Sequence, residues 1–260
     1  YRMFMKKKLL NLTNIYLIGD IGNTEVKIFL FNKNFIKVKK VMFKTKFISN
    51  NYLKKKLNFI KNNKIQSSLF SSVVPDAYKK IKNFLKLRFN IKCNELKNMN
   101  FSKLVKLKAN RLQVGSDRIA NAISAIDNKN NFIVVDFGTA TTFDVIVKNT
   151  YYGGIIAPGV SLSLNTLIKK ASLIPSINLS KVSKVVGTNT KLAVKSGFYW
   201  GYLGLIDNII FMIKKQTKKP FKLIFTGGFA YMFKNLKKNK PIIKKDLTIY
   251  GLLKVIKTNN

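Results

Sequence analysis

The sequence predicts an α/β protein made of two related domains. Each half of the chain opens on short apolar runs separated by turns and continues into helical stretches. A short motif occurs twice, as Asp20-Ile-Gly-Asn-Thr24 and as Asp136-Phe-Gly-Thr-Ala-Thr141. The 260 residues, 47% of them hydrophobic, are enough for two medium-sized cores. Strands that lead each half and helices that follow are typical of sheets covered by helices.

In the first half, apolar runs at residues 15–19 and 25–31 flank the first motif and predict a strand, a tight turn and a second strand. Pro75 favours the start of a helix, and the apolar residues after it recur at helical spacing. We expect further strands at residues 35–43, 68–74 and 91–96, and helices around 52–61 and from Pro75.

The polar segment 127–131 is the best candidate for a boundary, so we predict an N-terminal domain over 1–127 and a C-terminal domain over 128–260. The second half repeats the pattern of the first. We expect a helix over 119–126, a hairpin over 132–147, a strand within 151–159, helices over 162–170 and 190–216, a strand over 223–225, then a last helix and a strand over 247–250. Apolar residues on several faces predict that the 190–216 helix is buried.

The duplicated motif has a specific chemistry. Gly22 and Gly138 allow a tight turn and close approach to a ligand, and the backbone N–H groups of such a turn can face an anion. An aspartate beside phosphate needs a cation between them, so the motif indicates a metal–nucleotide complex. One copy alone fits an ordinary hairpin equally well. Two copies predict two RNase H-like domains of the actin-like kinase type, with a nucleotide cleft between them.

Composition excludes several kinds of chemistry. The chain has no histidine and one cysteine, which rules out a Ser-His-Asp triad, histidine-ligated zinc and an intrachain disulfide. The net charge of +39 suggests nucleic acid or a membrane surface. The lysines are dispersed among Asn, Ile and Phe, however, so a genome rich in A and T explains the charge without a partner. We therefore expect no specific nucleic-acid partner.

Targeting signals are not apparent in the sequence. The lysine cluster at 6–8 precedes two leucines, but neither a continuous apolar core nor a cleavage site follows. The longest apolar stretch, 198–213, is too short for a membrane span and is interrupted by Asp207. We expect a cytoplasmic protein without a membrane partner.

Only ten carboxylates are present, and half lie in or beside glycine-rich segments. These are Asp20, Glu25, Asp117, Asp136 and Asp144. Within Gly115-Ser-Asp-Arg118, Asp117 could accept a proton from an alcohol, while Arg118 and the N–H groups of a helix start could hold the substrate. The alternative is that Asp117 caps this helix and pairs with Arg118 on the surface.

Further glycine pairs have two interpretations each. Thr226-Gly-Gly228 suits an adenine or ribose lying against backbone, but a simple turn fits as well. Gly153-Gly154 is equally open, and for Pro158-Gly159 we favour a simple turn.

Taken together, the motifs resemble the type III pantothenate kinases. The motifs found in the order of that family are Asp20-Ile-Gly-Asn-Thr24, Ser71-Ser-Val-Val-Pro75, Gly115-x-Asp-Arg118, Asp136-x-Gly-Thr-Ala-x-Thr142, Gly153-Gly-x-Ile-x-Pro-Gly159, Leu173-Ile-Pro175, Gly187-x-Asn-Thr190, Ser196-Gly197 with Gly201, and Thr226-Gly-Gly228. The resemblance extends from about residue 15 to 250.

The resemblance implies a homodimer that phosphorylates pantothenate with ATP to give 4′-phosphopantothenate, the first step of coenzyme A biosynthesis. It also implies Mg²⁺ with ATP, and K⁺ or NH₄⁺. The implied ATP-binding residues are Asp20, Ile21, Gly22, Asn23, Thr24, Glu25, Val26, Lys27 and Thr139. The implied pantothenate-binding residues are Gly115, Ser116, Asp117, Arg118 and Thr190. Asp117 would be the catalytic proton acceptor, Asp20 would lie near magnesium, and Asp136 would bind the monovalent cation.

The sequence departs from the family at two positions. Lys108 and Arg111 stand where the family usually has a tyrosine and a proline, and that tyrosine contributes to the pantothenate site. Some relatives are transcriptional accessory proteins, so the alternative function is a catalytically weakened relative associated with nucleic acid. The intact Asp20, Asp117 and Asp136 favour the kinase.

Overall fold

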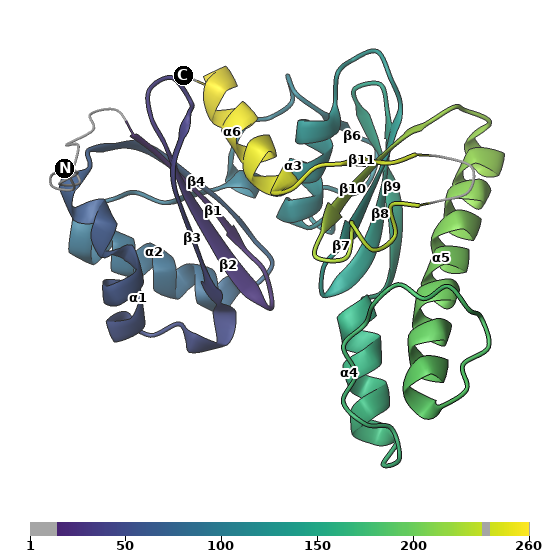
Figure 1. Ribbon diagram of the computed structural model, residues 1–260. Helices are drawn as coiled ribbons and strands as arrows, with labels where there is room; N and C mark the ends of the chain where they lie inside the picture. Colours follow the sequence, from purple (N-terminus) through teal and green to yellow (C-terminus); the bar gives the residue numbers. More distant parts are fainter. Residues whose placement is uncertain (1–14, 236–239, 260) are drawn as a thin grey trace, which may run out of the picture. The chain divides into compact units, whose positions relative to one another are not determined.

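The computed structural model describes residues 15–235 and 240–259, which form two compact units (Figure 1). Unit 1 holds the described residues up to Asn100, together with Gly115–Ala120 and the chain from Thr248 onward. Unit 2 holds Phe101–Val114 and Asn121–Leu247. The N-terminal lysine cluster at 6–8 lies outside the described residues.

Unit 1 is built on a five-stranded sheet with the order β3-β2-β1-β4-β5. Its strands are β1 (Ile15–Ile21), β2 (Glu25–Phe31), β3 (Lys37–Lys44), β4 (Ile65–Ser72) and β5 (Asn94–Glu95). The first three strands pair antiparallel, whereas β4 runs parallel to β1 and β5 parallel to β4. This register brings Asp20 opposite Lys27 on one side and Ser71 on the other.

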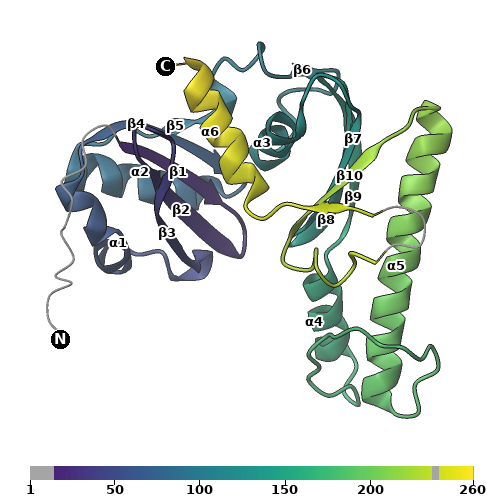
Figure 2. The same cartoon turned by 45° about the horizontal axis from the view of Figure 1, so that its top comes forward.

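Helices cover both faces of the unit 1 sheet, as Figures 1 and 2 show. α1 (Asn50–Leu57) and α2 (Pro75–Phe89) cover one face. The core there contains Ile15, Leu17, Ile28 and Leu30 from the sheet, Leu53 and Leu57 from α1, and Ile81 and Leu85 from α2. α6 (Leu247–Asn259) covers the other face, where the rings of Phe31 and Tyr250 make an edge contact. Burial on both faces explains why β1 and β2 are apolar almost throughout.

Unit 2 repeats this topology. Its strands are β6 (Lys106–Leu107), β7 (Phe132–Phe137), β8 (Ala140–Val147), β9 (Thr150–Pro158), β10 (Lys222–Gly227) and β11 (Ile242–Ile243). The order β9-β8-β7-β10-β11 matches β3-β2-β1-β4-β5, with the same parallel and antiparallel pairs. The short β6 extends the sheet beyond β9. Two related α/β units are therefore present, as the sequence predicts.

The helices of unit 2 pack on its sheet through limited faces. α4 (Val160–Lys170) and α5 (Thr190–Thr217) follow β9, and α3 (Ser116–Ala125) passes from unit 1 into unit 2 after Ala120. α5 buries residues such as Ile206 and Ile210, but Phe211 and Met212 are more than half exposed. Only one face of α5 is therefore buried in this chain, whereas the apolar residues on several faces predict a helix that is buried all round. Among residues 15–235 and 240–259, no helix has the apolar length needed to cross a bilayer.

Two segments are exchanged between the units. Phe101–Val114 groups with unit 2, because Lys106 pairs with Thr150 at the edge of its sheet. The C-terminal helix groups with unit 1, where Gly251 lies against Ala120. The predicted domains, 1–127 and 128–260, do not contain these exchanges, and their boundary stays a prediction.

The strand predicted over residues 247–250 is wrong, because α6 begins there. Short apolar runs suit either a strand or a helix, and Gly251 suggests a stop. The buried residues Ile249, Leu252, Leu253 and Ile256 instead follow the spacing of one helical face. The helix predicted just before this segment is not found among its described residues, where 229–233 form turns.

The position of Gly251 gives a stability prediction. A Cβ atom on this residue would lie 1.9 Å from the carbonyl oxygen of Ala120, so the helix backbone must move to accept one. We expect Gly251→Ala to lower the free energy of unfolding by about 1–3 kcal/mol, measured by urea denaturation. Gly204→Ala in α5 is the matched control, because no atom lies within 4 Å of its added Cβ. That variant should be neutral or slightly stabilised. Equal losses in both variants would contradict the packing argument.

Candidate active site

The first glycine turn joins β1 to β2 in unit 1 and is closed by hydrogen bonds. The Gly22 N–H donates to the Glu25 carbonyl at 3.0 Å. Thr45 fastens the turn from outside, since its hydroxyl donates to the Gly22 carbonyl at 2.6 Å and its N–H donates to the Thr24 carbonyl at 3.1 Å. Asn23 and Thr24 form the exposed tip. The backbone is therefore fixed while the tip faces solvent.

The flanking residues divide into core and surface. Ile21 and Val26 are fully buried in the core of unit 1, so only their backbone atoms can face a ligand. Asp20, Glu25 and Lys27 are half-buried. Asp20 and Lys27 stand opposite each other on adjacent strands, where side chains of opposite charge lie close together. The turn thus presents one carboxylate and one ammonium group side by side.

The second glycine turn, between β7 and β8 in unit 2, repeats the first. The Gly138 N–H donates to the Ala140 carbonyl at 3.0 Å, and Thr139 is exposed at the tip. Two glycines pack against this turn. A Cβ on Gly159 would lie 2.0 Å from the Thr139 carbonyl oxygen, and one on Gly227 would lie 2.5 Å from the Phe137 carbonyl oxygen. The interpretation of Pro158-Gly159 as a simple turn therefore does not account for the close contact with Thr139, which leaves no room for a side chain at Gly159.

Asp136 ends β7 and has a partner that the sequence analysis missed. Its Oδ2 accepts a hydrogen bond from Nδ2 of Asn121 at 3.0 Å, within unit 2. Asn121 is 1% exposed, so its amide is removed from water and its orientation is fixed by the protein. The available signal was an asparagine amid the apolar residues of 119–126. This contact holds the Asp136 carboxylate in one orientation.

Asp117 lies in the first turn of α3, in unit 1. A Cβ on Gly115 would lie 2.5 Å from its Oδ1, so the glycine makes room for the carboxylate. The same oxygen accepts the Arg118 N–H at 2.8 Å. Burial raises the pKa of Asp117, although the N–H bond and charge of Arg118 and the charge of Lys97 act against this shift. The carboxylate thus accepts an N–H group of the helix start and is at the same time desolvated.

Ser116 fastens α3 to β4 rather than lying open to a substrate. It is fully buried, and its Oγ lies 3.1 Å from the Ser71 Oγ. It accepts the Ser72 N–H at 2.9 Å and donates to the Ser72 carbonyl at 3.0 Å. This network explains the hydroxyls of the Ser71-Ser72 motif and holds Asp117 at the end of β4.

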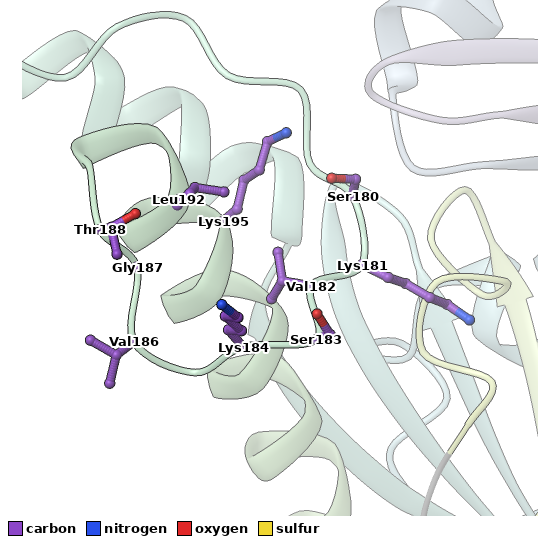
Figure 3. A pocket seen from close by; sticks show the side chains of 10 residues that line it. All are labelled: Ser180, Lys181, Val182, Ser183, Lys184, Val186, Gly187, Thr188, Leu192 and Lys195. Carbon is purple, nitrogen blue, oxygen red and sulfur yellow. The ribbon is translucent and has the colours of Figure 1, made fainter.

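Thr190 is the first residue of α5 in unit 2, where the Asn189 side chain caps the helix by accepting the Leu192 N–H at 3.0 Å. The preceding loop and Leu192 and Lys195 of α5 line a hollow of about 360 Å³, whose lining does not include Thr190 (Figure 3). Leu192 and Val182 point toward one another across this hollow, while Lys181 extends away. Its hydroxyl and lysine lining includes Ser180, Ser183, Thr188, Lys184 and Lys195.

The two residues that depart from the family pattern contact aromatic rings of unit 2. The Lys108 ammonium lies 4.9 Å from the centre of the Tyr152 ring. The backbone N–H of Lys108 donates to the Tyr151 carbonyl at 2.9 Å. The Arg111 guanidinium lies 4.6 Å from the centre of the Phe101 ring. Both cations therefore gain favourable aromatic contacts.

The described residues contain no cluster of three or more His, Cys, Asp and Glu that could hold a metal. Asp20 and Asp136 instead stand singly beside glycine turns. This fits a cation that is bound by one carboxylate together with phosphate oxygens, as is usual for Mg²⁺. Cys93 is buried, which raises the pKa of its thiol to about 11 and makes it unsuited to act as a nucleophile.

Comparison with known proteins decides the family. Residues 16–211 match the family model described as type III pantothenate kinase. A curated type III pantothenate kinase from Pelagibacter ubique is 56% identical over 92% of this chain and 97% of its own length. The chain belongs to the type III pantothenate kinase family. The resemblance inferred from the order of the motifs is thus confirmed.

Solved structures support the fold. A putative Baf family transcriptional activator from Campylobacter jejuni is 23% identical and aligns with a TM-score of 0.60 over 94% of this chain and 98% of its own. Component A of (R)-2-hydroxyglutaryl-CoA dehydratase from Acidaminococcus fermentans is 13% identical, with a TM-score of 0.55 over 95% and 100%. At these identities the likeness concerns the fold alone. It confirms two related α/β domains of the actin-like kinase type, and the cleft between them stays a prediction.

Proposed function

We propose that the protein transfers the γ-phosphate of ATP to the 4′-hydroxyl of pantothenate, giving 4′-phosphopantothenate for coenzyme A biosynthesis. The observation that carries this proposal is the pair of matching glycine turns, each closed by one hydrogen bond and each preceded by an aspartate. Membership of the pantothenate kinase family favours this activity over the nucleic-acid-associated alternative.

In this proposal, the turn from Asp20 to Lys27 and the tip at Thr139 hold the ATP phosphates. Gly22, Asn23 and Thr24 offer backbone N–H groups and polar side chains on a turn whose shape Thr45 fixes. Ile21 and Val26 contribute through their backbone, because their side chains are in the core. Preorganised N–H groups stabilise charge on a transferring phosphate without rearranging during the reaction.

Asp117 accepts the proton of the attacking hydroxyl. Phosphoryl transfer needs little base strength, so the main task of such a carboxylate is to orient the hydroxyl. The desolvation of Asp117 suits this role, because burial raises the pKa of the carboxyl and so makes the carboxylate a better proton acceptor. Gly115 completes the site by making room for the Asp117 carboxylate, and Arg118 would offer the substrate a positive charge.

Pantothenate carries a carboxylate, one amide, two hydroxyls and a carbon bearing two methyl groups. The loop before α5 offers matching groups, since lysines and hydroxyls line the same hollow as Val182 and Leu192 (Figure 3). We propose that Thr190 and its loop bind part of pantothenate. Ser116 contributes indirectly, by fixing the start of α3.

Two cations complete the proposal. Mg²⁺ would be held by Asp20 and the nucleotide, and it would neutralise charge on the phosphates. K⁺ or NH₄⁺ would be held by Asp136, whose carboxylate Asn121 orients. A second carboxylate facing the same phosphates would otherwise repel them. The alternative is that one of the many lysines neutralises Asp136.

The choice between these alternatives gives a prediction. Activity should rise several-fold when KCl or NH₄Cl replaces NaCl at constant ionic strength, because sodium is the smaller ion and the site contains one carboxylate. Pantothenate-dependent ADP release measures this effect directly. Asp136→Asn should remove the difference between the salts. Equal rates of the unaltered protein in sodium and potassium would show that a lysine has taken over the role.

We further propose that the protein is cytoplasmic, forms a homodimer and has no specific nucleic-acid partner. Light scattering at micromolar concentration tests the dimer, and a monomer mass would contradict it. The charge of +39 should still give weak, unspecific DNA binding. Affinity that falls steeply with salt and shows no sequence preference is the expected result, whereas selective binding at moderate salt would favour the regulator.

ADP release with and without pantothenate tests the reaction itself. With ATP, Mg²⁺ and K⁺ present, we expect release only when pantothenate is added. ADP release that is independent of pantothenate, from a folded protein, would point to another acceptor.

A further inference from the structure

A short turn after β5 lies beside the start of α3 in unit 1. The turn, η3 (Leu96–Asn98), contains Lys97. The Glu95 carboxylate accepts the Lys97 N–H at 2.7 Å. In the sheet, Glu95 pairs with Phe70, the neighbour of Ser71, whose Oγ lies 3.1 Å from the Ser116 Oγ. Glu95 thus holds the turn next to the start of α3, which carries Asp117. The motif comparison gives neither Glu95 nor Lys97 a role.

Lys97 is the charged group from outside α3 that acts on Asp117. Its positive charge favours the ionised carboxylate, as does that of Arg118 from the same helix. Glu95, which faces Lys97, is itself half-buried, and desolvation raises its pKa. Lys97 is half-buried as well, whereas Lys92, five residues earlier, is exposed. A half-buried lysine whose charge acts on two desolvated carboxylates differs from the exposed lysines of the surface.

We propose that Lys97 is a positioning residue that keeps Asp117 in the ionised, hydroxyl-accepting form, and that Glu95 fixes the turn that presents Lys97. The inference rests on the proposed role of Asp117 in the reaction. A desolvated carboxylate is costly to ionise unless a cation compensates it. Arg118 supplies one such cation and Lys97 a second, and desolvation still exceeds both effects on the pKa of Asp117. A lysine on a flexible stem compensates a charge well only when its backbone is held in place.

The direct test needs no activity. The chain has only eight aspartates, so protein labelled with ¹³C at aspartate Cγ gives a simple NMR spectrum, and Asp117→Asn identifies the Asp117 signal. Lys97→Met should move the titration of this signal to higher pH, and Lys97→Arg should restore it. Lys92→Met is the matched control and should change nothing. An unchanged titration in Lys97→Met would overturn the proposal.

Variants of Glu95 separate the turn from the charge. Glu95→Ala removes the acceptor of the Lys97 N–H and should shift the Asp117 titration in the same direction as Lys97→Met. Glu95→Gln keeps an acceptor oxygen and removes a negative charge, so it should give no upward shift. Upward shifts of equal size in both variants would show that Glu95 does not act by holding the turn.

The rate of pantothenate phosphorylation gives the second readout. Lys97→Met should lower kcat by roughly three- to ten-fold on the acidic side of the pH profile and by less on the alkaline side, because a higher pKa of Asp117 reduces its ionised fraction most at low pH. A loss of the same size at every pH would contradict the proposal and indicate a structural role. If the unaltered protein makes no phosphopantothenate while the NMR shift is present, the proposed function fails and the Lys97–Asp117 coupling stands.

Discussion

Replacing Asp117 by asparagine should lower kcat by roughly 10²–10⁴-fold, the usual cost of losing a group that accepts a proton in the reaction. Asparagine has nearly the same shape and can still accept the Arg118 N–H, so the helix start stays formed. ATP binding should change little, because the nucleotide turn of unit 1 is closed by Gly22, Glu25 and Thr45. Single-turnover rates and nucleotide titration measure the two effects separately.

Stability provides the control for this variant. Burial raises the pKa of Asp117, so the ionised carboxylate lowers the stability of the folded protein at pH values above this pKa. Asp117→Asn should therefore keep or slightly raise the free energy of unfolding at pH 8. A near-normal kcat in the variant would show that Asp117 has no catalytic role and only stabilises the start of the helix.

Asp20→Asn should act on the nucleotide instead of the hydroxyl. Loss of outer-shell partners of a metal typically costs 10–100-fold in affinity or activity, so loss of a direct contact should cost at least about 100-fold in kcat/KM for Mg–ATP. The amide also leaves Lys27 facing a neutral group across the strands. The expected signature is a large rise in KM for Mg–ATP that extra magnesium relieves in part.

A comparison of the two aspartate variants sharpens the test. Asp117→Asn should leave nucleotide affinity intact, whereas Asp20→Asn should weaken it even without pantothenate. Calorimetric titration with a non-hydrolysable ATP analogue measures this in both variants. Equal affinities in the two variants would remove Asp20 from the nucleotide site.

The sequence is most informative where a short segment determines its own geometry. Each glycine turn needs only a strand, an aspartate, a glycine and a second strand, and in both turns the glycine N–H donates to a carbonyl two or three residues later. The repeated sheet order follows from this duplication. The start of α3 also depends on neighbouring residues only. Gly115 makes room for the Asp117 carboxylate, and that carboxylate accepts the N–H of the next residue, Arg118.

Contacts between distant segments were not predictable in this way. Asn121 meets Asp136 and Gly159 meets Thr139 only after the sheet of unit 2 has formed. Ser116 gives no hint that Ser71 and Ser72 will surround it. Asparagine, glycine and serine are common residues, and only the tertiary structure shows which of them contact the site.

The error at the C-terminus has a different cause. Leu247-Thr-Ile-Tyr250 is β-branched and short, so local propensity favours a strand. The helix forms because apolar residues at helical spacing, from Ile249 to Ile256, become buried in unit 1. Burial by a distant segment of the chain here outweighs local preference.

The central claim is that this chain phosphorylates the 4′-hydroxyl of pantothenate, with Asp117 as acceptor. Phosphorus NMR of the product of ATP, Mg²⁺, K⁺ and pantothenate tests it most directly. We predict a phosphate monoester signal coupled to the two protons of the 4′-carbon, absent when Asp117→Asn replaces the unaltered protein at equal concentration. An ester at another position, or an equal yield from Asp117→Asn, would contradict the account.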